Sequence, residues 1–473
     1  MPFQPPRLGV GMIFAPALRP WLERRMAGPT PALDLLEIEP QTLWLADDAF
    51  AGPFHEFTAG IDLFRALPGA KLVHSVSLPL GGTRMPDPVQ CALIRDTAAR
   101  LDSPWVSEHL SVGGTPHQAA GFFLPPLQTE EGVALAARNI RAFQALVGRP
   151  VAVETGVAYL ARKAFEMPDG VYLAKVAERA DCGILLDLHN VWCNARNGRL
   201  KLDDFLAALP RARVWEMHLA GGMEQDGFWL DSHSGPIPPD LLAIAREVLA
   251  DLPALGALNF EVYDTFIPRM GEAELDRTAE TLRGLWEGVG RSVSDARPAV
   301  FASPPGQPSP SVAAWEAALT EAVWKAEIDA HPHKEDGNAV ALYARLARSF
   351  RGSMLARTLP RAIRYLILRE REAVEALLAR YYSAVSPRLY APLEAAAFAG
   401  WASEDGDPLL RGLLDYDLGL LAVLRDGKPQ LVRFPGNPAP VFEALAERRL
   451  PDCPPPPVWE LELLPETQGY LLS

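Results

Sequence analysis

The chain of 473 residues has little cysteine and no long apolar run, and each deficit excludes a class of protein. No uninterrupted apolar segment approaches the roughly 20 residues that a membrane-spanning helix needs. The four cysteines form no C-x-x-C pair and no dense framework, which argues against a disulfide scaffold and favours a reducing compartment. The sequence therefore predicts a globular protein without a membrane segment.

Positive charge is also scarce. The 45 Lys and Arg residues are outnumbered by 59 Asp and Glu residues, which gives a formal net charge of −14. A general nucleic-acid-binding protein has the opposite balance, so nucleic acid is not the expected partner. The N-terminal segment lacks the apolar core of a secretory signal, and we expect a cytoplasmic protein.

Eight short apolar runs mark the first part of the chain, with room for one helix between successive runs. The runs are Leu8–Phe14, Leu33–Glu39, Lys71–Leu78, Trp105–Leu110, Pro150–Thr155, Cys182–Asn190, Arg213–Leu219 and Leu258–Asp264. Apolar strands that alternate with helices indicate a parallel sheet. Eight such units predict an α/β fold, a closed (β/α)₈ TIM barrel over residues 1–290 that ends with a helix at Glu272–Val289.

The rest of the chain predicts a second domain, because one core cannot serve a chain of this length. Residues 291–311 are rich in Pro and Ser and indicate a linker. Residues 312–473 predict a smaller α+β, mainly helical domain with a small C-terminal sheet. The expected helices are Ala313–Ala330, Asn338–Phe350, Leu359–Leu366, Glu370–Ala384, Pro392–Glu404 and Leu409–Tyr416. The expected strands are Gly419–Arg425 and Pro429–Phe434, joined by an Asp426-Gly427 hairpin turn, and Val458–Leu464.

Seven of the eight runs carry an acidic residue or a histidine at or near the end, where barrel enzymes hold their functional groups. Several of these residues also have a purely structural explanation. His74 is compatible with a satisfied core histidine, and Asp187 and Asn190 bracket a turn where a helix cap is expected. Glu154 ends an apolar run, where a buried carboxylate needs a cation or hydrogen-bond donors.

The remaining polar residues can be assigned by their spacing. Alternation along a strand lets only one of Glu108 and His109 point into the barrel mouth, and we favour His109. Asp231 and His233 lie two apart in a loop, so both point to one side if that segment is extended. His218 precedes a glycine pair that lets the backbone approach a ligand. Together these donors exceed the six that one octahedral ion accepts, and imidazoles and carboxylates without a thiolate cluster suit iron, manganese or zinc.

At these residues the sequence resembles a known family. The segments LLEIE, HSVSLPLG, VSEHL, VETGVAYL, LLDLHNVW, EMHLAG and DSHSGPIPPD are similar, in order, to motifs of the multinuclear non-haem iron-dependent oxidative enzymes. The best-known member is the oxidase of methanobactin biosynthesis. The resemblance covers about Arg7 to Val289 and implies a TIM barrel with two or three iron ions. The ligands that it implies are His74, His109, Glu154, Asp187, Asn190, His218, Asp231, His233 and Glu261.

The chain departs from the family pattern in several places. Glu39 stands where the family has a histidine, and D-L-H-N at 187–190 replaces D-V-N-N. E-V-Y-D at 261–264 replaces E-W-D, so the family's acidic residue is displaced and Asp264 becomes the candidate for its catalytic role. These changes fall around the substrate more than on the ligands, and they indicate a divergent branch.

The resemblance implies an enzyme that uses iron and dioxygen to oxidise residues, chiefly cysteine, of a ribosomally synthesised precursor peptide. Family members commonly act with a separate partner protein that recognises the leader segment of the peptide. The C-terminal domain loosely resembles that partner and is expected to replace it. Arginines outnumber glutamates from Ala341 to Arg380, and Arg357, Arg361 and Arg364 are candidates for docking an acidic leader. A solvated helix face and a nucleic-acid surface are the alternatives.

Three other functions fit a barrel whose mouth carries these donors. A trinuclear-zinc phosphodiesterase similar to endonuclease IV would need a basic DNA-facing rim, which the acidic charge does not support. A sugar isomerase with one or two manganese ions would need a lysine among the strand ends. A non-catalytic metal- or peptide-binding scaffold would follow if the divergent motifs mark lost catalysis.

Overall fold

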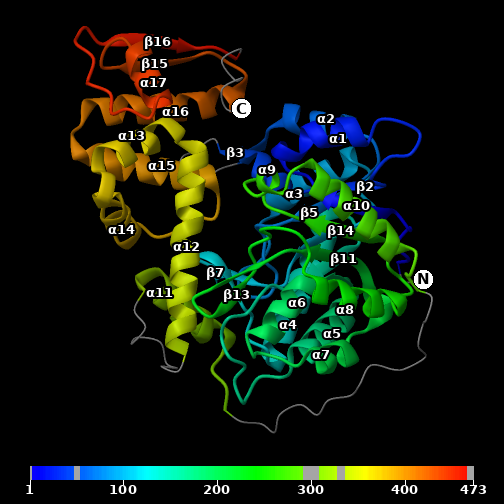
Figure 1. Ribbon diagram of the computed structural model, residues 1–473. Helices are drawn as coiled ribbons and strands as arrows, with labels where there is room; N and C mark the ends of the chain where they lie inside the picture. Colours follow the sequence, from blue (N-terminus) through cyan, green and yellow to red (C-terminus); the bar gives the residue numbers. More distant parts are fainter. Residues whose placement is uncertain (1–2, 47–53, 291–307, 327–335, 466–473) are drawn as a thin grey trace. The chain divides into compact units, whose positions relative to one another are not determined.

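A computed structural model of the protein describes residues 3–46, 54–290, 308–326 and 336–465 (Figure 1). Contacts divide the chain into two units. Unit 1 comprises Met1–Thr42, Thr58–Pro116 and Phe123–Ala318, and unit 2 comprises Leu43–Phe57, His117–Phe122 and Leu319–Ser473. Most of the predicted linker, residues 291–307, lies outside the described residues. Among the described helices, none is long and apolar enough to cross a bilayer.

Unit 1 is a closed barrel of eight parallel strands. The strands are β1 (Gly9–Ile13), β2 (Leu35–Ile38), β5 (Ala70–Ser75), β6 (Val106–His109), β9 (Val151–Glu154), β10 (Gly183–Asp187), β11 (Val214–Ala220) and β14 (Ala257–Glu261). Each strand pairs with the next one in this order, and β14 closes on β1. This topology confirms the predicted TIM barrel, and each strand lies within or next to one of the eight apolar runs.

Helices follow the barrel strands and surround them in Figure 1. They are α1 (Arg19–Arg25), α2 (Thr58–Ala66), α3 (Pro88–Arg100), α4 (Glu130–Val147), α5 (Asp169–Ala180), α6 (Leu188–Arg196), α7 (Leu202–Ala208), α8 (Pro239–Ala250), α9 (Ile267–Met270) and α10 (Glu272–Trp286). Two hairpins extend from the loops: β7 (Val112–Thr115) with β8 (Gln118–Leu124), and β12 (Met223–Gln225) with β13 (Phe228–Leu230). The second hairpin leads directly to Asp231 and His233.

Strand alternation places a polar layer above an apolar layer inside the barrel. The apolar layer consists of Leu35, Leu72, Trp105, Ala152, Leu185, Trp215 and Ala257. On six of these strands the residue two positions further on faces the same side and is polar, namely Glu37, His74, Ser107, Glu154, Asp187 and Asn259. A register shift between β10 and β11 aligns Glu216 with Leu185 and His218 with Asp187. The polar layer therefore lies toward the carboxyl ends of the strands.

Unit 2 is mainly helical. Its helices are α12 (Gly337–Thr358), α13 (Pro360–Glu370), α14 (Val374–Ala384), α15 (Ala391–Ala402), α16 (Pro408–Asp426) and α17 (Ala439–Ala446), and the division between the units falls within α11 (Val312–Lys325). Two small antiparallel sheets complete it, β3 (Trp44–Ala46) with β4 (Phe54–Glu56), and β15 (Gln430–Phe434) with β16 (Trp459–Leu463). The C-terminal region is thus mainly helical, as predicted, and ends with the pair β15 and β16.

The strand predicted at Gly419–Arg425 is wrong, because this segment is the second half of α16. Asp426-Gly427 forms no hairpin turn: Gly427 has a φ of 61° and its N–H donates to the carbonyl of Val423, which ends the helix. An Asp-Gly pair suits both structures, since each needs a residue that adopts a positive φ. The partner of β15 is instead β16, the last apolar run.

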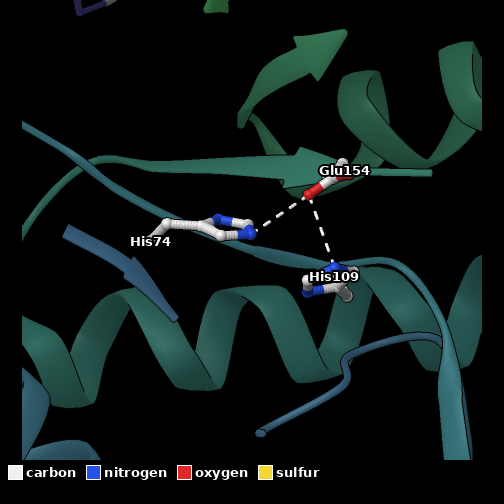
Figure 2. Close-up of side chains that lie close together, drawn as sticks. All are labelled: His74, His109 and Glu154. Carbon is white, nitrogen blue, oxygen red and sulfur yellow. Dashed lines mark ion pairs between the residues drawn. The ribbon is translucent and has the colours of Figure 1, made fainter. Parts of the chain in front are cut away.

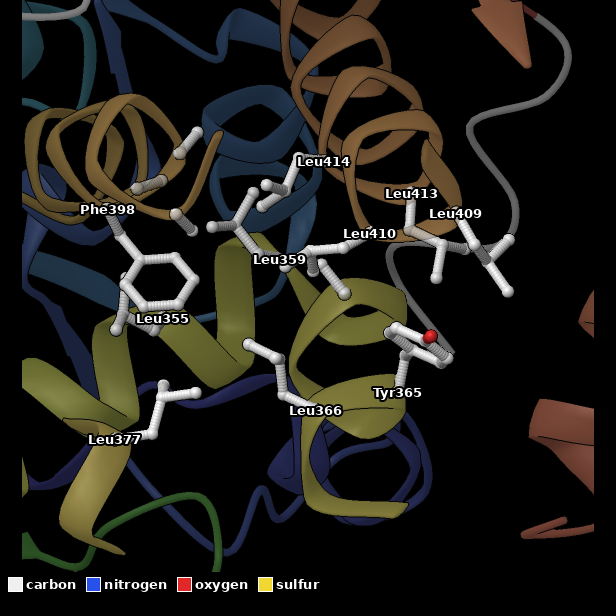
Figure 3. Close-up of a cluster of buried hydrophobic side chains, with 14 of the residues drawn as sticks. Leu355, Leu359, Tyr365, Leu366, Leu377, Phe398, Leu409, Leu410, Leu413 and Leu414 are labelled. Carbon is white, nitrogen blue, oxygen red and sulfur yellow. The ribbon is translucent and has the colours of Figure 1, made fainter. Parts of the chain in front are cut away.

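The core of unit 2 is formed by side chains from α12 to α16, as Figure 3 shows. At the edge of this core lies a buried ion pair. The Nε of Arg351 donates to Glu394 Oε1 at 2.7 Å, and the two side chains are 1% and 0% exposed. Tyr381 also donates to Glu394 Oε1, at 2.8 Å, and the backbone N–H of Arg388 donates to its Oε2 at 3.0 Å. This carboxylate therefore ties three segments together.

Replacing Glu394 by Ala should destabilise unit 2 by about 3–5 kcal/mol, because Arg351 would keep a buried and uncompensated charge. Denaturant unfolding of the full chain measures the change. The matched control is Glu447→Ala, which removes an exposed ion pair with Arg449 and should change stability by about 0–1 kcal/mol. Equal effects of the two substitutions would contradict the structural role of Glu394.

Candidate metal centre

Three donors from neighbouring strands form the first group, which Figure 2 shows. The Nε2 atoms of His74 on β5 and His109 on β6 lie 3.3 and 3.5 Å from Glu154 Oε2 on β9. The Nδ1 of His74 contacts Ser107 Oγ at 2.8 Å, so its Nε2 is the atom that faces the carboxylate. One atom from each donor lies within 4.8 Å of the others, which is close enough for a shared ion.

Glu108 precedes His109 on β6, and its Oε1 lies 3.5 Å from His109 Nδ1. Its Oε2 accepts hydrogen bonds from Ser75 Oγ at 2.5 Å and from the backbone N–H of Leu78 at 3.0 Å, and its Oε1 accepts from the N–H of His109 at 2.8 Å. The side chain is fully buried. Glu108 thus holds the loop after β5 and the end of β6, while His109 joins His74 and Glu154.

The turn after β10 supplies two further donors. Asp187 Oδ1 accepts from the N–H of Asn190 at 2.7 Å and caps α6, as the capping explanation predicts. Asp187 Oδ2 is buried and has no hydrogen-bond partner. Asn190 Nδ2 donates to Glu154 Oε1 at 3.3 Å, and its Oδ1 is likewise unpartnered. In each side chain one polar atom forms a hydrogen bond within the protein, and the other polar atom is available to bind a ligand in the barrel mouth.

Asp231, His233 and Glu261 meet on the other side of the mouth. His233 Nε2 lies 2.6 Å from Asp231 Oδ1, and His233 Nδ1 lies 2.9 Å from Glu261 Oε1. His233 has a φ of 40°, so the segment is not simply extended, yet the two residues do converge. Both ring nitrogens and Asp231 Oδ1 lack hydrogen-bond geometry despite these short distances. One atom from each of Asp187, His233 and Glu261 lies within 4.8 Å of the others, which is close enough for a shared ion.

His189 completes this side, and a glycine makes room for it. His189 is buried on α6 and groups with Asp231 and His233. A Cβ atom on Gly222 would lie 2.4 Å from His189 Nε2. The second glycine of the pair after His218 therefore admits the side chain of a donor, where the sequence predicts close approach to a ligand.

His218 lies over a hydrogen-bonded network in the polar layer. Its Nδ1 is 3.1 Å from Glu261 Oε2 and its Nε2 is 2.9 Å from Glu37 Oε2. Asn259 Nδ2 donates to Glu37 Oε2 at 2.8 Å and to Glu216 Oε1 at 2.9 Å. Glu37, Glu216 and His218 are close enough to hold an ion, but the amide donor directed at both carboxylates favours a hydrogen-bonded support.

The donor groups overlap. Apart from the network under His218, they are His74–His109–Glu154, Glu154–Asp187–His218, Asp187–His233–Glu261 and His189–Asp231–His233. Each group shares one member with the next, so adjacent positions have a residue in common. Asp187 Oδ2 and Asn190 Oδ1 have no hydrogen-bond partner, and Glu154 Oε2 and Asp231 Oδ1 contact imidazoles without hydrogen-bond geometry. Since buried polar atoms are normally satisfied, these groups are candidate metal positions, and neighbouring groups share Glu154, Asp187 or His233.

The pKa values of the candidate donors also favour the binding of cations. Burial raises the pKa of Glu154 to about 7, and burial together with Glu154 and Asp231 raises the pKa of Asp187 well above its usual range. Burial lowers the pKa of His189 to about 4, so its imidazole is neutral and able to ligate. For His109, burial is outweighed by Glu154 and Glu108, and the pKa rises to about 9. Cations would replace these protons, so their affinity must fall as the pH falls.

The other predicted site residues lie outside these groups. Asp264 is exposed and its Oδ1 accepts a hydrogen bond from the N–H of Ala17 at 2.7 Å, so its catalytic role stays a prediction. In unit 2, Arg357 and Arg364 are exposed. Arg361 differs, because its Nη1 pairs at 2.9 Å with the fully buried Asp417.

Sequence reasoning does not include His189, Glu37 or Glu216 among the donors. The signal for His189 is present, since D-L-H-N at 187–190 has a histidine where the family pattern has asparagine. Glu37 lies near the end of the second apolar run, two residues before Glu39. Glu216 gives no such signal, because its inward position results from the register shift beside β10.

The sequence of the barrel is similar to those of other known proteins. The family described as RiPP precursor modification enzyme MbnB/TglH/ChrH matches residues 17–282. A UPF0276 protein of Anaeromyxobacter sp. (strain Fw109-5) is 35% identical over 211 residues, which is 44% of this chain and 74% of that protein. A UPF0276 protein of Pseudomonas aeruginosa (strain UCBPP-PA14) is 32% identical over 286 residues, which is 58% of this chain and 94% of that protein.

Solved structures are more distant. A xylose isomerase domain protein from Planctomyces limnophilus is 13% identical with a TM-score of 0.39, over 61% of this chain and 99% of that one. Endonuclease IV from Thermus thermophilus is 18% identical with a TM-score of 0.38, over 59% of this chain and 99% of that one.

Adjacent residues on β6 should respond differently to substitution. His109→Ala should lower the bound metal, since it removes a donor from the mouth. Glu108→Gln should keep the metal but lower stability by about 1–3 kcal/mol, because an amide N–H₂ would face a hydrogen-bond donor in a buried site. Metal analysis and thermal unfolding of both variants make the test, and the reverse pattern would show that the two residues have exchanged roles.

Proposed function

The chain belongs to the RiPP precursor modification enzyme family MbnB/TglH/ChrH, and on this premise we propose the chemistry that its barrel performs. The protein is a multinuclear non-haem iron oxidase. It uses dioxygen to oxidise residues, chiefly cysteine, of a ribosomally synthesised and post-translationally modified peptide. The C-terminal domain recognises that peptide, in place of a separate partner protein.

The observation that carries this proposal is the set of overlapping donor groups with unpartnered buried atoms. His74, His109 and Glu154 would hold one ion, and His189, Asp231 and His233 would hold another. A further ion would be held by Glu154, Asp187 and His218 or by Asp187, His233 and Glu261, with Asn190 beside them. Iron ions there would supply the electrons and open positions that dioxygen and a substrate thiolate require. Two or three ions match the donor count.

The protein's own residues decide how a substrate approaches. Several predicted ligands form close pairs between a carboxylate and an imidazole. Of these, His109 and Asp231 have the most exposed side chains, at 14% and 24%. The ring of Phe123 lies 4.5 Å from the ring of His109, and the half-exposed ring of Tyr263 lies 4.9 Å from that of His233. A substrate would therefore approach from the His109 and Asp231 sides, where these two rings would flank an entering side chain and limit its water.

The proposed recognition of the peptide rests on exposed arginines of unit 2. Arg357 at the end of α12 and Arg364 on α13 are exposed and close in sequence. Their charge suits an acidic leader segment. Arg361 is unsuited to this role, because its guanidinium pairs with Asp417 and lies 4.9 Å over the ring of Tyr416.

Metal content tests the oxidase assignment. Protein purified without oxygen should contain iron, and Asp231→Ala or His233→Ala should lower the iron content and abolish oxidation of a Cys-bearing precursor peptide. Circular dichroism should show an intact barrel, because both residues lie in a loop. Zinc in place of iron would favour the phosphodiesterase, and full iron occupancy in both variants would remove these residues from the ligand set.

Charge reversal tests the docking surface. The double variant Arg357→Glu/Arg364→Glu should bind the precursor peptide more weakly than the parent, and the loss should be larger at low salt, because screening weakens exposed charges. Its metal content should be unchanged. Arg449→Glu is the control, since Arg449 is also an exposed arginine of unit 2, with a 62% exposed side chain. Turnover of a leader-bearing peptide at the parent rate would show that docking lies elsewhere.

A further inference from the structure

We propose that the β12–β13 hairpin is clamped to α6 in order to assemble the outer metal position, and that Asn197 and Trp229 are its positioning residues. The outer position is the group His189, Asp231 and His233. This inference rests on the proposed metal centre, and it assigns a role to residues outside the donor set. It also predicts that metal can be lost from the outer position while the other positions still bind metal.

The three donors of the outer position come from two different supports. His189 lies on α6, whereas Asp231 and His233 follow β13 at the end of the hairpin. The group is complete only while the hairpin stays against the helix. The group His74, His109 and Glu154, by contrast, lies on three adjacent strands of the barrel and needs no hairpin.

Asn197 joins the end of α6 to the backbone of β13. Its Oδ1 accepts from the N–H of Trp229 at 2.8 Å, and its Nδ2 donates to the carbonyl of Trp229 at 3.0 Å. One side-chain amide thus satisfies both backbone groups of a strand residue, on the edge of β13 that faces away from β12. The two strands of this hairpin have three residues each. The Asn197 side chain bonds to the backbone of β13 as a third strand would.

Aromatic and cationic contacts reinforce the same junction. The guanidinium of Arg196 lies 4.6 Å from the ring of Trp192 and 4.4 Å from the ring of Trp229. The two indoles meet edge to face at 4.9 Å. Asp240 accepts from Trp192 Nε1 at 3.2 Å and pairs with Arg196 at 3.1 Å, which fixes the helix side of the clamp. The clamp therefore combines hydrogen bonds between the Asn197 side chain and the backbone of Trp229 with cation–π and edge-to-face aromatic contacts.

The hairpin would not hold its donors without this clamp. An isolated two-stranded hairpin is marginally stable in water. His233 has a φ of 40°, which a non-glycine residue adopts only where its surroundings impose it. Its carbonyl accepts from the N–H of Tyr263 at 3.1 Å, and Ser234 N–H donates to the carbonyl of Gly221 at 2.8 Å. These bonds fix the end of the segment, and the clamp fixes its beginning.

The experiment uses the full chain, stripped of metal and reloaded with isotopically enriched ferrous iron alone under anaerobic conditions. Asn197→Ala and Trp229→Ala should bind one class of iron about 10- to 100-fold more weakly than the parent and keep the rest. The Mössbauer component that they lose should be the one lost in His189→Ala, which removes a donor of the outer position. Trp229→Phe keeps an aromatic ring under Arg196, so this variant should bind iron with about the affinity of the parent.

Controls separate this role from general destabilisation. Glu224 lies on the exposed strand of the same hairpin, and Glu224→Ala should leave iron binding at the parent level. His74→Ala should lose a different Mössbauer component. If Asn197→Ala and Trp229→Ala retain all iron at parent affinity, or lose all components equally, the clamp does not position the outer site. A parent protein that binds no iron would instead overturn the proposed function itself, and the inference with it.

Discussion

The barrel depends on one electrostatic constraint: acidic and imidazole side chains are buried together at one end, where their charges must be compensated on the spot. Deep in the polar layer the protein provides the compensation itself, since Asn259 and Trp105 donate to Glu37 and Glu216. Nearer the mouth it provides much less, and several donor atoms are unpartnered. The boundary between these levels passes through His218, which contacts a carboxylate with each ring nitrogen.

The donors differ in how firmly the fold holds them. Those on β5, β6 and β9 are fixed by the backbone hydrogen bonds of the barrel, so their separation follows from strand spacing. Asp231 and His233 are fixed by side-chain contacts of a short hairpin, which are weaker and more easily altered. Variation of the hairpin would therefore change one of the candidate metal positions without disturbing the others.

The arginines of one basic stretch in unit 2 have two different roles, since some stabilise the fold and others lie on the surface. The arginine-rich segment predicted as a docking face contains Arg351, which is buried against Glu394, and Arg361, which is bound to Asp417. These two side chains bridge helices, and their charge is balanced inside the unit. Arg357 and Arg364 are exposed to external contacts. Counting charges along the sequence cannot separate these two roles, because burial is a property of the folded chain.

The sequence alone determined the barrel, because eight apolar runs separated by room for helices indicate parallel strands, and seven of the runs carry an acidic residue or a histidine at or near the end. Residue type at strand ends, together with resemblance to the family, also predicted most of the residues that the structure brings together as candidate donors. The tertiary structure decided what depends on contacts between distant segments. A register shift turns Glu216 inward, Gly222 makes room for His189, and the end of α16 takes the Asp-Gly pair that predicts a hairpin. In each case local propensity permits two outcomes, and packing selects one.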